Sequence, residues 1–141
     1  MRVPSPFHYS FFVTELSSTR RFYGETLGCR EGRSAATWVD FDFFGSQISA
    51  HTSGHPVPTE NRGVVDGTAV PIPHFGAILG WDDFHGLAAR IRAAGVPFVI
   101  EPRGRFVGQP AEQATMFLLD PAGNALEFKA MAKPENLFAK S

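Results

Sequence analysis

The sequence predicts an α+β fold built from two repeated βαβββ modules that form a curved mixed sheet. Three observations predict this class. His8 and His74 each begin a strand-like run of aromatic and β-branched residues, 66 positions apart. Gly28 and Gly95 each end the helix-like segment that follows, and they are 67 positions apart. After each helix-like segment come further short apolar runs separated by turn residues, which indicates strands. Two copies of one supersecondary unit account for this spacing.

Size and composition indicate a single domain. The chain has 141 residues, of which 43% are hydrophobic, enough to bury a core without disulfides. Its 13 basic and 14 acidic side chains give a formal net charge of −1, so we expect neither nucleic acid nor a membrane as a partner. There is no signal-peptide pattern and no apolar run of roughly 20 residues. The single cysteine, Cys29, fits a reducing compartment, and we expect a cytoplasmic location.

The first module is expected at residues 7–52. In the strand 7–13, alternation places His8 on one face with Ser10 and Phe12, while the opposite face is suited to receive a helix. The remaining elements are a helix capped by Ser17 or Ser18 and ended by Gly28, and a hairpin of strands 36–44 and 46–52.

The second module is expected at residues 74–129. Its elements are a strand at 74–80, a helix from Asp82 or Asp83 to Gly95, a strand at 97–101, an irregular stretch at 102–113, and strands at 115–119 and 124–129. Residues 53–73, rich in proline and glycine, link the modules. A connection this long is either mobile or functional, such as a lid beside a site. Residues 130–141 form a tail.

Three residues are candidates for holding one metal ion. His8 and His74 occupy equivalent places in the repeated strands, and Glu127 stands among apolar residues of the last strand. A buried carboxylate without a partner costs several kcal/mol, so Glu127 needs one, and a metal ion supplies it. Two imidazoles and one carboxylate are the donor set of non-haem Fe(II) enzymes. The sequence therefore predicts a metal site inside the curved sheet, with Fe(II) favoured over Mn(II), Zn(II) or Ni(II).

The chain resembles the vicinal oxygen chelate superfamily, which includes glyoxalases, bleomycin-resistance proteins and extradiol dioxygenases. The segments that carry this resemblance are 22–28 (FYGETLG), the strand opening at His74, and 119–128 (LDPAGNALEF). Further segments, 37–45, 108–110 and 112–117, resemble a small bacterial group predicted to be extradiol-dioxygenase-like. The resemblance implies metal ligands at His8, His74 and Glu127. It also implies a homodimer, and leaves open whether modules pair within or across chains.

Two positions distinguish activities within this resemblance. Ser49 stands where glyoxalase-like and epimerase-like members place a fourth ligand, so a three-ligand, dioxygenase-like site is favoured. Phe117 stands where extradiol enzymes carry a tyrosine, and Gln109 and Gln113 occupy the stretch of their catalytic histidine. His51 is the candidate to replace that histidine.

The leading hypothesis is a non-haem Fe(II) ring-cleaving dioxygenase acting on a small catechol-like substrate with vicinal oxygens. The candidate substrate-binding residues are Trp38, Phe44, Phe106, Phe117, Gln113 and Arg103. A second hypothesis is a glyoxalase-type isomerase or epimerase, in which a protein base moves a proton. A third is a resistance-type protein that binds a small molecule without catalysis, and a fourth is an inactive protein in which the histidines merely pair with Glu127.

Overall fold

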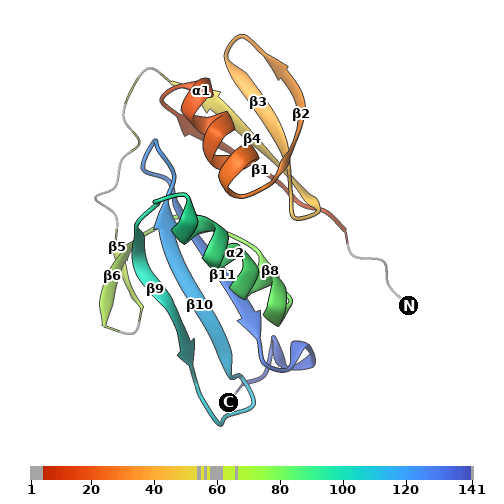
Figure 1. The fold of residues 1–141 in the computed structure, drawn as a ribbon, viewed down its shortest axis with the longest axis vertical. Coiled ribbons are helices and arrows are strands. Elements are labelled where there is room, and N and C mark those ends of the chain that lie inside the picture. Colours follow the sequence, from red (N-terminus) through yellow and green to blue (C-terminus); the bar gives the residue numbers. More distant parts are fainter. Residues whose placement is uncertain (1–4, 54, 56, 58–61, 66, 141) are drawn as a thin grey trace. The chain divides into compact units, whose positions relative to one another are not determined.

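The computed structural model describes residues 5–53, 55, 57, 62–65 and 67–140. The chain divides into two compact units (Figure 1). The first contains the described residues up to 57 and the turn Asp120–Gly123, and the second contains the described residues from 62 onward without that turn. Both units combine strands with a helix, which confirms the predicted α+β class. Among the described residues, no helix has the length and apolar character needed to cross a membrane.

The first unit is a four-stranded sheet with one helical segment. Its elements are β1 (His8–Val13), α1 (Leu16–Thr19) continued by the π-helical η1 (Arg20–Thr26), β2 (Arg30–Ala35), β3 (Trp38–Phe43) and β4 (Ser46–Thr52). The strand order is β1-β4-β3-β2, in which β1 and β4 are parallel and the other pairs antiparallel. The chain therefore runs β-α-β-β-β, with β2 as a strand in addition to the predicted hairpin.

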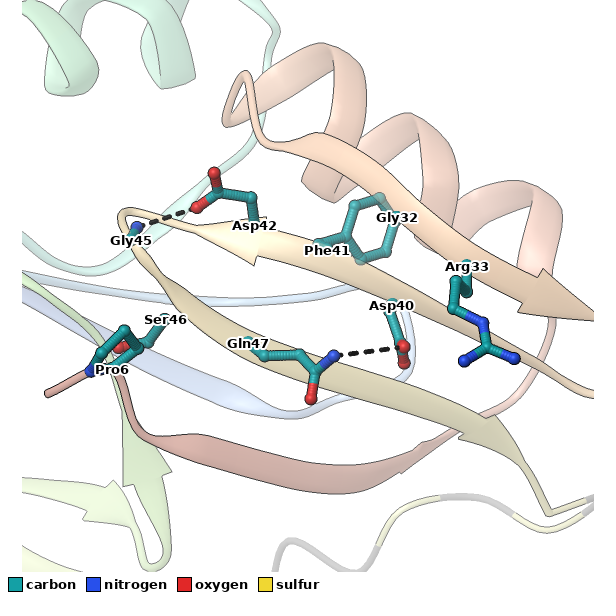
Figure 2. Close-up of a pocket in the computed structure, with 9 residues that line it drawn as sticks. All are labelled: Pro6, Gly32, Arg33, Asp40, Phe41, Asp42, Gly45, Ser46 and Gln47. Carbon is teal, nitrogen blue, oxygen red and sulfur yellow. Dashed lines mark hydrogen bonds between the residues drawn. The ribbon is translucent and has the colours of Figure 1, made fainter.

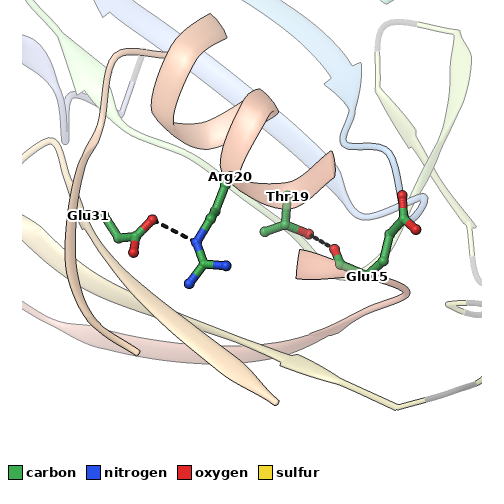
Figure 3. A network of polar contacts seen from close by, with 4 residues as sticks. All are labelled: Glu15, Thr19, Arg20 and Glu31. Atoms are coloured by element: carbon green, nitrogen blue, oxygen red, sulfur yellow. Dashed lines mark hydrogen bonds and ion pairs between the residues drawn. The ribbon is translucent and has the colours of Figure 1, made fainter. Parts of the chain in front are cut away.

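The helix of the first unit begins earlier than the serines suggested. It starts at Leu16 after Glu15, whose side chain makes no capping hydrogen bond, so the predicted cap at Ser17 or Ser18 is wrong. Figure 3 shows the contacts that fix this start. The Thr19 hydroxyl donates to the Glu15 carbonyl at 2.7 Å, which joins the first turn to the preceding loop. The next residue, Arg20, donates to Glu31 of β2 at 2.9 Å, an exposed ion pair of small energetic value.

One face of β1 is buried and the other is open, as its alternation predicted. Phe11 and Val13 are buried, whereas His8, Ser10 and Phe12 are exposed. Hydrophobic burial thus fixes which face of the strand carries His8, because a shift of one residue would expose the apolar set.

Tyr23 is the centre of the first unit's core. It is fully buried, and its hydroxyl donates to the carboxylate of Asp120 at 2.8 Å. Burial, with the nearby Asp120 charge, raises the pKa of Tyr23 well above its usual value, so the phenol stays neutral. Asp120 also accepts from the backbone of Ala122 at 2.9 Å, which holds the turn before the last strand.

The second unit contains two sheets and one longer helix. Its elements are β5 (Arg62–Val65), β6 (Thr68–Pro71), β7 (His74–Phe75), β8 (Ile78–Leu79), α2 (Trp81–Ala93), β9 (Phe98–Arg105), β10 (Gln113–Leu119), β11 (Ala125–Met131) and the 3-10 turn η2 (Pro134–Asn136). The larger sheet has the order β7-β11-β10-β9, with β8 also paired to β11, and β5 pairs with β6. The helix α2 buries the predicted apolar stripe that includes Phe84, Leu87 and Ile91.

Three expectations about the second unit and its linker need correction. The helix begins at Trp81 after Gly80, and Asp82 and Asp83 lie in its first turn rather than at the cap. In the first turn their negative charges interact favourably with the helix dipole. Residues 102–105, predicted as irregular, continue β9, which pairs with β10 up to Arg105. Part of the linker 53–73 forms the β5–β6 hairpin, while its residues 54, 56, 58–61 and 66 lie outside the described part.

Candidate metal site

The second unit brings two of the three predicted ligands together. His74 begins β7, which runs parallel to β11 and pairs with it at Ala125, two residues before Glu127. The imidazole Nε2 of His74 lies 3.3 Å from Oε1 of Glu127. The Glu127 side chain is only 9% exposed, so little water can solvate its carboxylate. The pair is therefore a buried acid facing a half-buried imidazole.

Two neighbours fix the position of Glu127. The Thr115 hydroxyl on β10 is fully buried and donates to Oε2 of Glu127 at 2.6 Å. Gly76, between β7 and β8, lies so close to β11 that a Cβ atom there would overlap the Glu127 carbonyl group. Glycine is thus required for the segment after His74 to lie against the strand that carries the acid.

The hydrogen bond on the other side of the ring determines what His74 offers to Glu127. The ring Nδ1 lies 2.9 Å from the carbonyl oxygen of Pro71, which can only accept, so Nδ1 carries the proton. In the neutral ring, Nε2 is then an unprotonated acceptor that faces a carboxylate oxygen. Two acceptors at 3.3 Å need a shared cation, either a second proton on His74 or a metal ion. The donor set of this pair fits a divalent metal.

The third predicted ligand, His8, lies in the first unit at the exposed end of β1. Its Nδ1 is 2.8 Å from Oε1 of Gln47, and its Nε2 is 3.0 Å from the hydroxyl of Ser10. Gln47 in turn approaches Asp40 on β3, with 3.4 Å between Nε2 and Oδ2. The other oxygen of Asp40 accepts from the hydroxyl of Ser49 at 2.5 Å.

Strand register relates Ser49 to Glu127. In the first unit His8 pairs with Gln47, two residues before Ser49. In the second unit His74 pairs with the residue two positions before Glu127. Each unit contains a carboxylate that accepts a hydrogen bond from a hydroxyl on the neighbouring strand: Asp40 from Ser49 in the first unit, and Glu127 from Thr115 in the second. The last strand carries the acid in the second unit and the hydroxyl in the first.

The predicted triad is divided between the two units. His8 belongs to the first unit, and His74 and Glu127 belong to the second. Across the described part of the chain, no three histidine, cysteine or acidic side chains gather at one point. The largest portion of the predicted triad within one unit is the His74–Glu127 pair.

Two predicted substrate-binding residues lie on β10, and one of them, Phe117, is close to this pair. Phe117 pairs with Glu127 across the strands, and its ring lies edge-on to His74 with centroids 4.9 Å apart. It is buried in a cluster with Val70 of the β5–β6 hairpin. Gln113, further along the strand, is 8% exposed. Among the described residues, the Oε1 of Gln113 is a buried acceptor with no hydrogen-bond donor.

The other predicted residues lie at turns or on neighbouring strands. Phe44 and Phe106 occupy turns with φ of 52° and 53°, and each is 42% exposed. Arg103 lies on β9 and pairs with Thr115 across the strands. Trp38 on β3 lies opposite His51 on β4, with ring centroids 6.3 Å apart.

Cavities open on the first unit, and two of them lie beside residues described above. One, of about 330 Å³, lies beside the carboxylates of β3 (Figure 2). Its lining residues are Pro6, Gly32, Arg33, Asp40, Phe41, Asp42, Gly45, Ser46 and Gln47. The second, of about 380 Å³, is lined by Ser10, Phe11, Phe12, Thr37, His51 and Thr52. His51 therefore lines the second cavity, whereas no histidine lines the first.

Sequence reasoning missed two polar residues that contact the predicted ligands. Thr115 bonds Glu127, and Gln47 connects His8 to Asp40. Alternation places Gln47 on the same face of its strand as Ser49 and His51, but its pairing with His8 depends on the register of the parallel strands β1 and β4. The contact of Thr115 with Glu127 is diagonal, and it depends on the register of β10 against β11.

Comparisons with known proteins agree with this architecture. A family model described as the glyoxalase/bleomycin resistance protein/dioxygenase superfamily matches residues 5–128. A crystal structure of a glyoxalase/bleomycin resistance protein/dioxygenase from Alicyclobacillus acidocaldarius is similar, with a TM-score of 0.78 and 29% identity over 98% of this chain and 100% of that one. The fosfomycin resistance protein FosX from Listeria monocytogenes shares the fold, with a TM-score of 0.67 and 18% identity over 96% and 98% of the two chains.

A third similar structure is a virulence protein from Salmonella typhimurium, with a TM-score of 0.63 and 23% identity over 93% of this chain and 99% of that one. Among curated proteins, none is similar enough to this chain to be matched. The family model covers most of the chain, including His8, His74 and Glu127. The chain therefore belongs to the glyoxalase/bleomycin resistance protein/dioxygenase superfamily.

Proposed function

We propose that this protein is a metal-dependent, extradiol-type dioxygenase that acts on a small substrate with vicinal oxygens. In this proposal His8, His74 and Glu127 hold the metal, and Fe(II) is the ion. One observation carries it: Nε2 of His74, on a ring whose Nδ1 is held by the Pro71 carbonyl, faces a carboxylate oxygen of Glu127 at 3.3 Å in a nearly buried place. Such an arrangement is unfavourable unless a cation lies between the two groups.

The hydrogen bonds of the two histidines further support this ligand set. The Pro71 carbonyl oxygen contacts Nδ1 of His74 and leaves Nε2 for a metal. In the same way, Oε1 of Gln47 contacts Nδ1 of His8. Partners of this kind orient the imidazoles in metal sites. Ser49, at the place of a fourth ligand, is already bonded to Asp40, which favours three protein ligands. A divalent ion with this donor set supplies Lewis-acid chemistry at open coordination positions.

The candidate substrate-binding residues have the side chains that an aromatic substrate with polar groups needs. Phe117, beside His74, gives an apolar wall that excludes water. The buried Oε1 of Gln113 is suited to accept a hydrogen bond from a substrate hydroxyl. Arg103, across from Thr115, offers a positive charge for an anionic substituent. In the first unit, the neighbouring rings of Trp38 and His51 offer an aromatic surface.

Oxygen consumption tests this proposal. Protein loaded with Fe(II) under anaerobic conditions is mixed with a panel of catechols in air-saturated buffer. We expect consumption of one dioxygen per catechol cleaved, and loss of this activity in Glu127→Ala. The matched control is Glu101→Ala, which removes an exposed acid of β9 that forms a surface ion pair with Arg92. No dioxygen consumption across the panel by the metal-loaded protein would contradict the dioxygenase assignment.

A second candidate function, a glyoxalase-type isomerase or epimerase, is favoured by one observation. Asp40 places a half-buried carboxylate beside Ser49, where this class needs a ligand or a base. A carboxylate there is suited to remove a proton from carbon next to a carbonyl group. Deuterium exchange from D₂O into an α-hydroxy ketone, without dioxygen consumption and lost in Asp40→Asn, would favour this candidate over the dioxygenase.

A further inference from the structure

The side chains around His8 form a chain of hydrogen bonds that runs through Gln47 and ends at the carboxylate of Asp40. The ionised carboxylate of Asp40 accepts hydrogen bonds and donates none. One of its oxygens accepts from Ser49 at 2.5 Å. The other faces Nε2 of Gln47 at 3.4 Å, and Figure 2 shows these two side chains directed toward one another.

The role of Asp40 determines the orientation of the Gln47 amide. With its NH₂ group toward the carboxylate, the amide must direct its carbonyl oxygen, Oε1, to the other side. There Oε1 lies 2.8 Å from Nδ1 of His8, and as an acceptor it requires the proton to be on Nδ1. The reversed amide would place an oxygen against the carboxylate and an NH₂ group against His8. Electrostatic repulsion between Asp40 and that oxygen disfavours the reversed orientation.

The other hydrogen-bond partner of His8, Ser10, does not determine which ring nitrogen carries the proton. The Ser10 hydroxyl lies 3.0 Å from Nε2. A hydroxyl both donates and accepts, so Ser10 is compatible with either tautomer. The position of the His8 proton is therefore set from the Gln47 side, and the lone pair on Nε2 is the one that remains for a metal.

We propose that Asp40 is a positioning residue for His8: acting through Gln47, it fixes the tautomer whose unprotonated Nε2 can bind a metal ion in place of its hydrogen bond to Ser10. Asp40 need not touch the metal or the substrate for this role. The inference rests on the proposed function only for metal binding by His8, because the tautomer itself is a property of the metal-free protein.

The direct test is the protonation pattern of His8 in metal-free protein. Long-range ¹H–¹⁵N NMR spectra at about pH 8.5, where an ordinary imidazole is neutral, distinguish protons on the two ring nitrogens. The His8 signals are assigned by their loss in His8→Gln. We expect wild type to carry the proton on Nδ1, and Asp40→Asn and Gln47→Leu to shift population to the form with the proton on Nε2.

The matched control is Asp42→Asn, two residues along the same strand. Asp42 accepts from the backbone of Gly45 at the turn, so its substitution should leave the His8 tautomer as in wild type. Unchanged spectra in Asp40→Asn, or a wild-type His8 with its proton on Nε2, would overturn the proposal.

A second readout is the affinity for Mn(II), measured by calorimetry. Loss of an outer partner of a metal-binding histidine typically weakens affinity about 10- to 100-fold, and because Gln47 is exposed we expect about 10-fold in Asp40→Asn. Asp42→Asn should bind as wild type does. A wild-type protein with the expected tautomer that binds no metal would uphold the positioning role and contradict the proposed function instead.

Discussion

The hydroxyl of Thr115 is the most direct support for the Glu127 carboxylate, and Thr115→Val tests its contribution. Valine has nearly the shape of threonine, so the substitution removes the hydrogen bond without leaving a cavity. Thr115 is fully buried and Glu127 is 9% exposed, so little water is available to replace the lost donor. A hydrogen bond to a charged group contributes about 1.5–3 kcal/mol, and we expect the free energy of unfolding to fall by that amount.

The assay is urea unfolding of the metal-free protein, followed by metal titration. We expect Thr115→Val to lower the free energy of unfolding with an unchanged urea slope, and to weaken metal binding about 10- to 100-fold. Thr115→Ser keeps the hydroxyl and should restore most of the metal affinity. If Thr115→Val unfolds within about 0.5 kcal/mol of wild type and binds metal equally well, the bond at 2.6 Å does not support the site.

Three further predictions concern other parts of the structure. Tyr23→Phe removes the hydroxyl that donates to Asp120 and should lower the free energy of unfolding by about 1–3 kcal/mol, measured in urea. Because burial raises the pKa of Tyr23, its contribution is complete below about pH 10 and is lost as the pH rises through the folded-state pKa, so the alkaline loss of stability should be smaller in Tyr23→Phe. Gly76→Ala forces a Cβ atom into the Glu127 carbonyl group and should lower both the melting temperature and metal occupancy; a variant with wild-type values for both would contradict the close approach. Phe138 is 89% exposed, so Phe138→Ser should change the free energy of unfolding by less than about 0.5 kcal/mol, and a larger loss would show that this side chain packs.

The sequence predicted the elements that depend on hydrophobic alternation and on helix-ending glycines. The face of β1 that carries His8, the stripe of α2, and the left-handed Gly28 and Gly95 are as expected, with φ of 80° and 77° at the two glycines. Propensity failed at the helix starts. Ser17 and Ser18 are good capping residues, but the helix begins at Leu16, before both of them.

The site was only partly accessible from sequence. Its equivalence to His8 in the repeat singled out His74, and its apolar neighbours singled out Glu127. The structure places these two side chains 3.3 Å apart. Arg103 lies in the stretch 102–113 that the sequence predicts as irregular, yet pairing with β10 extends β9 through it. The link from Asp40 to His8 depends on side chains of three strands, and local sequence contains no signal for such a register.

The central claim is that His8, His74 and Glu127 hold one metal ion, and metal stoichiometry tests it most directly. Wild type, His8→Ala, His74→Ala and Glu127→Ala are purified anaerobically, exposed to Fe(II), desalted and analysed for iron, with His85→Ala as the control for loss of an exposed helix histidine. We expect about one iron per chain in wild type and His85→Ala, and little in the other three. Full iron occupancy in any of those three would contradict the assignment of that residue, and a wild-type protein without iron would contradict the site itself.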